Sequence, residues 1–115
     1  MGYVIIRQHP DTDEYVIWDN GSDMPVAVGT RDEIAHDAGE LEPDRTDLEA
    51  RLAHTDLYGS SMAAPGRTLG HWDDEGLIYR QTGFLPRELL FVAACRLIVE
   101  DDEEAVAFML EPFDD

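Results

Sequence analysis

The first thirty residues alternate short apolar runs with polar breaks, a pattern typical of strands joined by turns. The runs "YVIIR" from Tyr3 and "YVIW" from Tyr15 are rich in β-branched and aromatic residues, and "HPDTDE" lies between them. The Asn-Gly pair at 20–21 favours a hairpin with a type I′ turn, because both residues tolerate positive φ angles. In the third run, "MPVAVG", Pro25 lacks an N–H, so this strand lies at the sheet edge or starts after the proline. The pattern predicts an antiparallel β-meander over residues 3–28.

Two capping-box motifs predict the next two elements. In such a motif a Thr and a Glu three residues later satisfy each other's backbone N–H groups at a helix start. "TRDE" opens a helix predicted over 31–38, which Gly39 should end. "TDLE" opens a second helix, predicted over 47–58. The capping residues would be Thr30 with Glu33, and Thr46 with Glu49.

The second half of the chain is less regular. Glycine-rich residues 59–76 show no periodicity, which predicts a long loop. A short strand is predicted at about 77–82. The run 86–99 is apolar almost all round, which favours a buried helix with Pro86 in its first position, and a central strand is the alternative. The last apolar element, at about 104–110, fits either helix or strand.

These elements predict one domain over residues 1–115. A chain of this length is long enough for a hydrophobic core. Strands at the start followed by helices indicate the α+β class, with an antiparallel sheet and helices packed on one face.

The charge of the chain limits its function more than any motif does. The chain has 26 acidic and eight basic residues, a formal charge of -18, and every basic residue is arginine. Without lysine there is no Walker A loop, no lysine Schiff base and no ordinary protein-kinase site. The carboxylates also argue against direct binding of nucleic acid or of an anionic membrane. Such acidity reflects either habitat and codon usage or function, and the sequence leaves both open.

The single cysteine and the N-terminal sequence indicate the cellular setting. Cys95 cannot form an intrachain disulfide, which fits a reducing compartment, and its apolar neighbours predict an inert buried thiol. The apolar run at residues 3–6 is too short for a signal peptide, and no apolar run approaches the roughly 18 residues of a membrane span. We therefore expect a soluble, cytoplasmic protein.

The segment "GHWDDEG" at residues 70–76 is the strongest candidate for metal chemistry. His71, Asp73 and Asp74 offer nitrogen and oxygen donors that Zn²⁺ or Mn²⁺ uses. A second cluster could complete the site if the fold brings it near, and it comprises His9, Asp11 and Asp13. The alternative is a polar turn at each place. A divalent metal is thus possible, and the sequence predicts no other cofactor.

Two further motifs depart from their templates. "DNGSD" at residues 19–23 has its glycine too early for an EF-hand loop and lacks the later ligands. "YGSSMA" at residues 58–63 follows a helix and has Ala63 where a nucleophile elbow has its second glycine. The sequence therefore predicts no catalytic residues.

The remaining hypothesis is that the acidic surface itself binds a partner. Carboxylates on the two predicted helices could meet the basic or mixed surface of another protein. The residues of this predicted face are Asp32, Glu33, Asp37, Asp47, Glu49 and Asp56. The leading interpretation is a non-enzymatic accessory or protein-interaction module. The alternatives are a metal-dependent enzyme or metal-binding protein using the 59–76 loop, and a DNA-mimic inhibitor of a nucleic-acid-binding protein.

Overall fold

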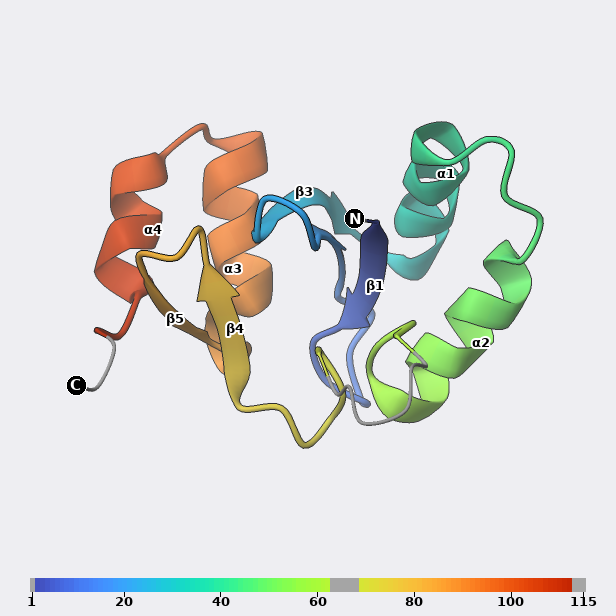
Figure 1. The fold of residues 1–115 in the computed structure, drawn as a ribbon, viewed down its shortest axis with the longest axis horizontal. Coiled ribbons are helices and arrows are strands. Elements are labelled where there is room, and N and C mark those ends of the chain that lie inside the picture. The colour runs from blue at the N-terminus through green and yellow to red at the C-terminus, as the bar shows by residue number, and fades with distance from the viewer. Residues whose placement is uncertain (1, 63–68, 113–115) are drawn as a thin grey trace.

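The computed structural model describes residues 2–62 and 69–112. Three antiparallel strands, β1 (Tyr3–Arg7), β2 (Tyr15–Asp19) and β3 (Met24–Gly29), form one sheet in that order (Figure 1). The β-meander predicted from the alternating pattern is therefore confirmed. β2 is the central strand, and its side chains from Tyr15 to Trp18 are buried.

The turn between β2 and β3 differs from the one predicted. It spans residues 20–23, and the left-handed residue is Asp23 (φ 56°) rather than Asn20 or Gly21. The Asp19 carboxylate accepts hydrogen bonds from the Gly21 N–H at 2.9 Å and from the Ser22 hydroxyl at 2.8 Å. These bonds stabilise a turn wider than the two-residue type I′ turn, so that prediction was wrong.

The first two helices begin close to the expected residues. α1 (Arg31–Leu41) has the predicted capping box, and it continues past Gly39 because a single glycine costs a helix only about 1 kcal/mol. α2 (Leu48–Tyr58) has no capping box. Its N-cap is Asp47, whose side chain makes no cap bond and instead accepts from Arg45 at 2.7 Å.

The predicted strand at 77–82 is in fact a hairpin of two strands, β4 (Gly76–Tyr79) and β5 (Gly83–Pro86). Arg80 (φ 49°) and Gln81 (φ 59°) form the left-handed turn between them, although neither residue type favours that conformation. Pro86 ends β5 and is the N-cap of the helical segment that follows, one residue before the first helical position in which it was predicted.

The apolar run after Pro86 is helical, so the strand alternative was wrong. It comprises a 3₁₀ turn η1 (Arg87–Leu89), the helix α3 (Leu90–Ala94) and a π-helical segment η2 (Cys95–Val99). The last element is a helix, α4 (Glu103–Met109). Within the described residues, no helix is long and apolar enough to cross a membrane.

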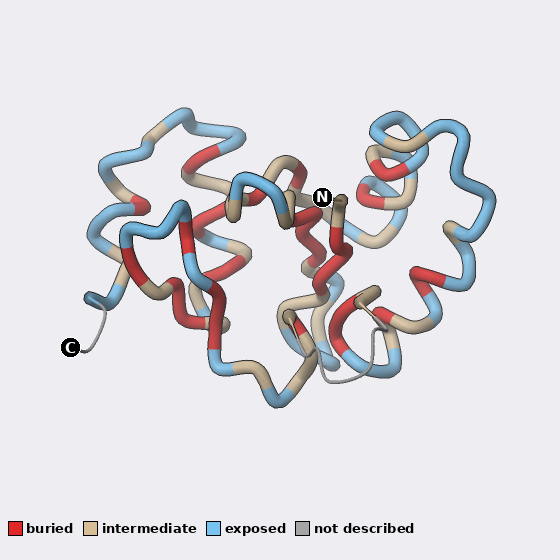
Figure 2. Tube along the Cα trace, in the orientation of Figure 1, coloured by how far each residue is buried: buried red, intermediate tan, exposed pale blue. Residues whose placement is uncertain are grey.

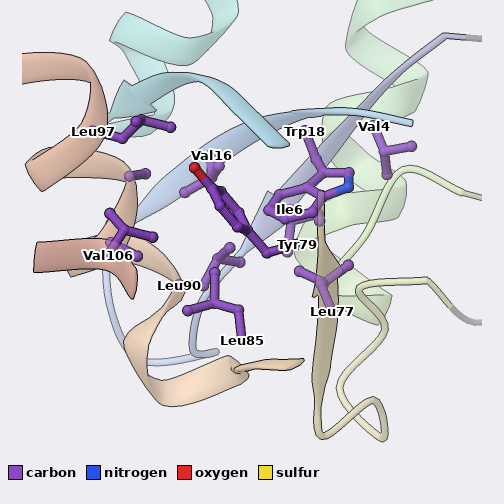
Figure 3. Close-up of a cluster of buried hydrophobic side chains, with 12 residues drawn as sticks. Val4, Ile6, Val16, Trp18, Leu77, Tyr79, Leu85, Leu90, Leu97 and Val106 are labelled. Atoms are coloured by element: carbon purple, nitrogen blue, oxygen red, sulfur yellow. The ribbon is translucent and has the colours of Figure 1, made fainter. Parts of the chain in front are cut away.

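Helices cover both faces of the three-stranded sheet, which defines two cores (Figures 1 and 2). α1 and α2 lie together on one face, where Ile17 of β2 packs with Ile34 and Leu52. On the other face Val16 and Trp18 point toward Leu90 and the β4–β5 hairpin (Figure 3). The α+β class is confirmed. Helices lie on both faces of the sheet rather than on the one face predicted, because β2 buries side chains in both directions.

The two edges of the sheet differ. Along β1, the Ser61 N–H donates to Ile5 O at 2.8 Å and the Arg7 N–H to Gly59 O at 2.9 Å, so residues 59–61 cover this edge. Hydrogen-bonding directions alternate along an antiparallel ladder, so the N–H and C=O of Val28 in β3 point away from β2. No described residue outside the sheet bonds to them.

Candidate functional site

The "GHWDDEG" segment forms a turn held by one of its own carboxylates. The two oxygens of Asp74 accept hydrogen bonds from the N–H of Gly70 at 2.9 Å and of Gly76 at 3.4 Å. Gly70 has a φ of 81°, a conformation that favours glycine. Asp73 is exposed on the same turn. The arrangement is that of the polar turn that the sequence offered as the alternative to a metal site.

Arg87 anchors this turn to the end of β1. Its guanidinium donates to Gly70 O at 2.6 Å, to His71 O at 2.8 Å and to Gln8 O at 3.1 Å. It also donates to the carbonyl of Arg7 and lies 5.2 Å from the Trp72 ring. Burial lowers the pKa of Arg87, which nevertheless stays charged because arginine titrates far above neutral pH. No sequence motif indicated this role.

His71 lies beside a histidine that sequence reasoning did not single out. The ring centroids of His71 and His54 are 5.9 Å apart, and Tyr58 lies 4.5 Å from His54 and 6.0 Å from His71. Each histidine has one ring nitrogen at a backbone carbonyl: His54 Nδ1 is 2.8 Å from Ser60 O, and His71 Nε2 is 2.6 Å from Met62 O. His54 sits on α2 in no recognisable motif, so only the fold reveals the pair.

The second predicted cluster is also part of a turn. His9 Nδ1 lies 3.8 Å from a carboxylate oxygen of Asp11, and both side chains are largely exposed. Asp13 accepts from the N–H of Arg31 at 2.8 Å, at the start of α1. Across residues 2–62 and 69–112, no group of three His, Cys, Asp or Glu side chains is arranged to hold a metal ion. The metal site stays a prediction, and residues 63–68 of its loop lie outside the described residues.

The predicted acidic face divides into paired and unpaired carboxylates. Asp47 accepts a hydrogen bond from Arg45. Asp56 accepts hydrogen bonds from the Tyr15 hydroxyl at 2.6 Å and from Arg31 at 3.0 Å. Burial, followed by the hydrogen bond and charge of Asp56, raises the pKa of Tyr15 to about 12. Glu49 is exposed on α2. The paired carboxylates of α2 therefore stabilise the fold.

The acidic residues of α1 line a groove along β3, here called the β3-edge groove. Its apolar part is a hollow of about 290 Å³ between α1 and η2, and a second hollow of about 410 Å³ continues beside the first turns of α1. The apolar residues of the groove are Val26, Ala27, Val28, Leu41, Ile98 and Val99. Its acidic residues are Asp32, Glu33, Asp37 and Glu40. The groove thus combines an apolar floor with an acidic rim.

The acidic residues on the rim of the groove differ in their hydrogen-bond and ion-pair partners. Glu33 is engaged in the capping box, and Glu40 lies 2.6 Å from His36 Nε2. Asp32 and Asp37 form no ion pair with any residue that the structure describes. Opposite them, Val99 is 72% exposed. Among the described residues, the groove therefore combines carboxylates without an ion pair and exposed apolar surface.

Cys95 lies in η2, half-buried and without a disulfide partner. Burial raises the pKa of its thiol, and the charges of Glu100 and Glu14 add to this effect. A raised pKa keeps the thiol protonated and weakens it as a nucleophile.

Comparisons with protein-family models, with curated proteins and with solved structures find no match to this chain.

Proposed function

We propose that this protein is a non-enzymatic interaction module that binds a basic partner protein through the β3-edge groove. The observation that carries the proposal is that two carboxylates, Asp32 and Asp37, lie beside exposed apolar side chains along β3, and that no described residue forms an ion pair with either of them. Apolar side chains of the partner would fill the hollow, and its arginines or lysines would meet the rim. Electrostatic complementarity of this kind speeds association and excludes acidic partners.

A second copy of this chain fits the groove poorly. Two such grooves would bring their acidic rims together, and like charges facing each other across an interface cost several kcal/mol. The formal charge of -18 adds repulsion between copies at low salt. The charge balance therefore favours a different, basic chain.

The proposal is tested with a blocked ten-residue peptide of alternating arginine and valine as the probe. Its affinity is measured by calorimetry, and its contacts are mapped by amide chemical shifts. The groove variant is Asp32→Asn with Asp37→Asn, and the control is Glu88→Gln with Glu104→Gln, which removes two exposed charges elsewhere. We expect shifts along β3 and η2, and a loss of affinity of roughly tenfold in the groove variant alone. Equal losses in both variants, or shifts spread over the surface, would mean diffuse attraction and contradict the proposal.

Metal binding is a second candidate function, supported by the His54–His71 pair. In each neutral ring, the nitrogen beside the backbone carbonyl carries the hydrogen and donates it to that carbonyl. The other ring nitrogen is then unprotonated and can bind a metal ion, as in many metal sites. Thermal unfolding with Zn²⁺ and Mn²⁺ tests it, since a ligand of the folded state raises the midpoint. The increase should disappear in both His54→Gln and His71→Gln. An increase that survives both substitutions would place the metal elsewhere.

A further inference from the structure

A second surface feature lies away from the β3-edge groove, at the start of α2. It is a pocket of about 520 Å³, within the size range of small-ligand sites. Its polar lining residues are Asn20, Arg45, Asp47, Arg51, His54 and Ser61. Its apolar lining includes Val4, Ala50 and Met62. Of the eight arginines in the chain, two line this pocket, together with one histidine.

Two carboxylates hold the two arginines in place, because Glu42 contacts both and Asp47 accepts from Arg45 Nε at 2.7 Å. Glu42 lies 3.2 Å from Arg51 Nη1 and 3.3 Å from Arg45 Nη1, and Arg51 also donates to Tyr3 O at 2.8 Å. Arg51 is 7% exposed. A guanidinium has five N–H donors, and the described residues accept two hydrogen bonds from that of Arg51. Donor capacity therefore remains beside the pocket.

The two arginines and the two carboxylates beside them balance in formal charge, so burial has the largest effect on the pKa of Arg51. Burial lowers the pKa of Arg51, and the charge of Arg45 lowers it further, against the opposing effect of Glu42 and Asp47. An anion in the pocket would add an attractive charge interaction that favours the charged form of Arg51. The geometry and the burial of Arg51 thus favour an anionic ligand.

The first turn of α2 adds donors of its own. The first backbone N–H groups of a helix have no partner within the helix, and here the N-cap side chain of Asp47 does not bond them. Ala50, in this first turn, lines the pocket. Helix N-termini favour anions through these N–H groups and through the helix dipole. Ser61 Oγ accepts from the Ile5 N–H at 2.9 Å, and no described residue accepts the hydrogen of this hydroxyl.

We propose that this pocket binds the phosphate or carboxylate group of a small molecule, held by Arg45, Arg51 and the first turn of α2. The apolar lining would contact the rest of the ligand. This inference does not depend on the proposed function, because the pocket and the β3-edge groove share no lining residue.

The probes are inorganic phosphate and acetate, each titrated at constant ionic strength with chloride as the balancing anion. Amide chemical shifts of Asn20, Ala50 and Ser61 report binding. We expect a saturable change confined to the pocket with at least one probe, and the probe that gives it identifies the preferred anion. No saturable change with either probe would overturn the inference.

Matched arginine variants locate the site. Arg45→Gln removes a half-exposed guanidinium from the pocket, whereas Arg96→Gln removes a half-exposed guanidinium on η2 that pairs with Glu100. We expect Arg45→Gln to weaken binding roughly tenfold, the loss of one charge-assisted contact, and Arg96→Gln to leave it unchanged. Equal weakening in both variants would mean nonspecific attraction and would also overturn the inference. Arg45 is half-exposed, so a folded variant is expected.

Discussion

The two edges of the central sheet avoid nonspecific strand pairing in different ways. The β1 edge is covered by residues 59–61, with Arg51 and Arg87 donating to carbonyls at either end. The β3 edge is not covered, but it carries Pro25, a bulge opposite Ile17 and Trp18, and a row of carboxylates from α1. Proline, bulges and charge are all known to discourage edge-to-edge aggregation.

This difference follows from how the chain uses its few basic side chains. Each arginine in the described residues bonds a carboxylate or a backbone carbonyl. The described arginines make contacts within the fold, mainly around the β1 side, and Asp32 and Asp37 at the β3 edge form no ion pair with any described residue. These two carboxylates supply the charge that the proposed function assigns to an external partner.

The largest effect should come from replacing Arg87, whose guanidinium joins the end of β1 to the turn that begins at Gly70. Arg87→Met keeps an apolar stem but leaves four backbone carbonyls without their donor. We expect the free energy of unfolding to fall by about 3 kcal/mol, measured by urea denaturation. The control Arg96→Met, whose guanidinium is half-exposed, should cost less than about 1 kcal/mol. Similar losses in both variants would show that Arg87 is not needed to close this edge.

Alkaline pH should weaken the attachment of α2 to the sheet. The pKa of Tyr15 is raised to about 12 in the folded protein from its usual 10.0, so the stability that it contributes is full below pH 10 and is lost as pH rises toward 12. We expect wild type to lose about 1–2 kcal/mol more than Tyr15→Phe between neutral pH and about pH 11. Urea denaturation across this range measures the difference. Parallel stability curves would contradict the assigned pKa.

The smallest effect should come from the β3 edge, and it should have the opposite sign. Asp37 lies one helical turn from Glu33 and Glu40, so Asp37→Asn relieves like-charge repulsion. We expect stabilisation of roughly 0.3–0.5 kcal/mol at low salt, which disappears at about 1 M salt. Asp56→Asn, which weakens bonds to Tyr15 and Arg31, should instead destabilise the protein. Thermal unfolding at two salt concentrations tests both. Destabilisation by Asp37→Asn would mean that the rim carboxylates are paired after all.

The candidate sites could be predicted from sequence only where local patterns were sufficient. Three of the six acidic residues predicted to bind a partner, Asp32, Glu33 and Asp37, line the groove, and their role in binding stays a prediction. The pocket could not be found, because its residues come from β1, the turn after β2, the link before α2, α2 itself and residues 61–62. His54 and Arg87 were missed for the same reason, since their partners lie on other elements.

The sequence by itself determined the strands of the meander, the start of α1 and the net charge. These depend on alternation and on contacts within one turn, as between Thr30 and Glu33. Only the tertiary structure decided that residues 87–99 are helical, that β2 is covered on both faces, and which carboxylates remain unpaired. The physical reason is that burial and ion pairing join residues far apart in the chain, as Tyr15 and Asp56 are. A local pattern constrains backbone conformation but does not specify which distant side chains meet.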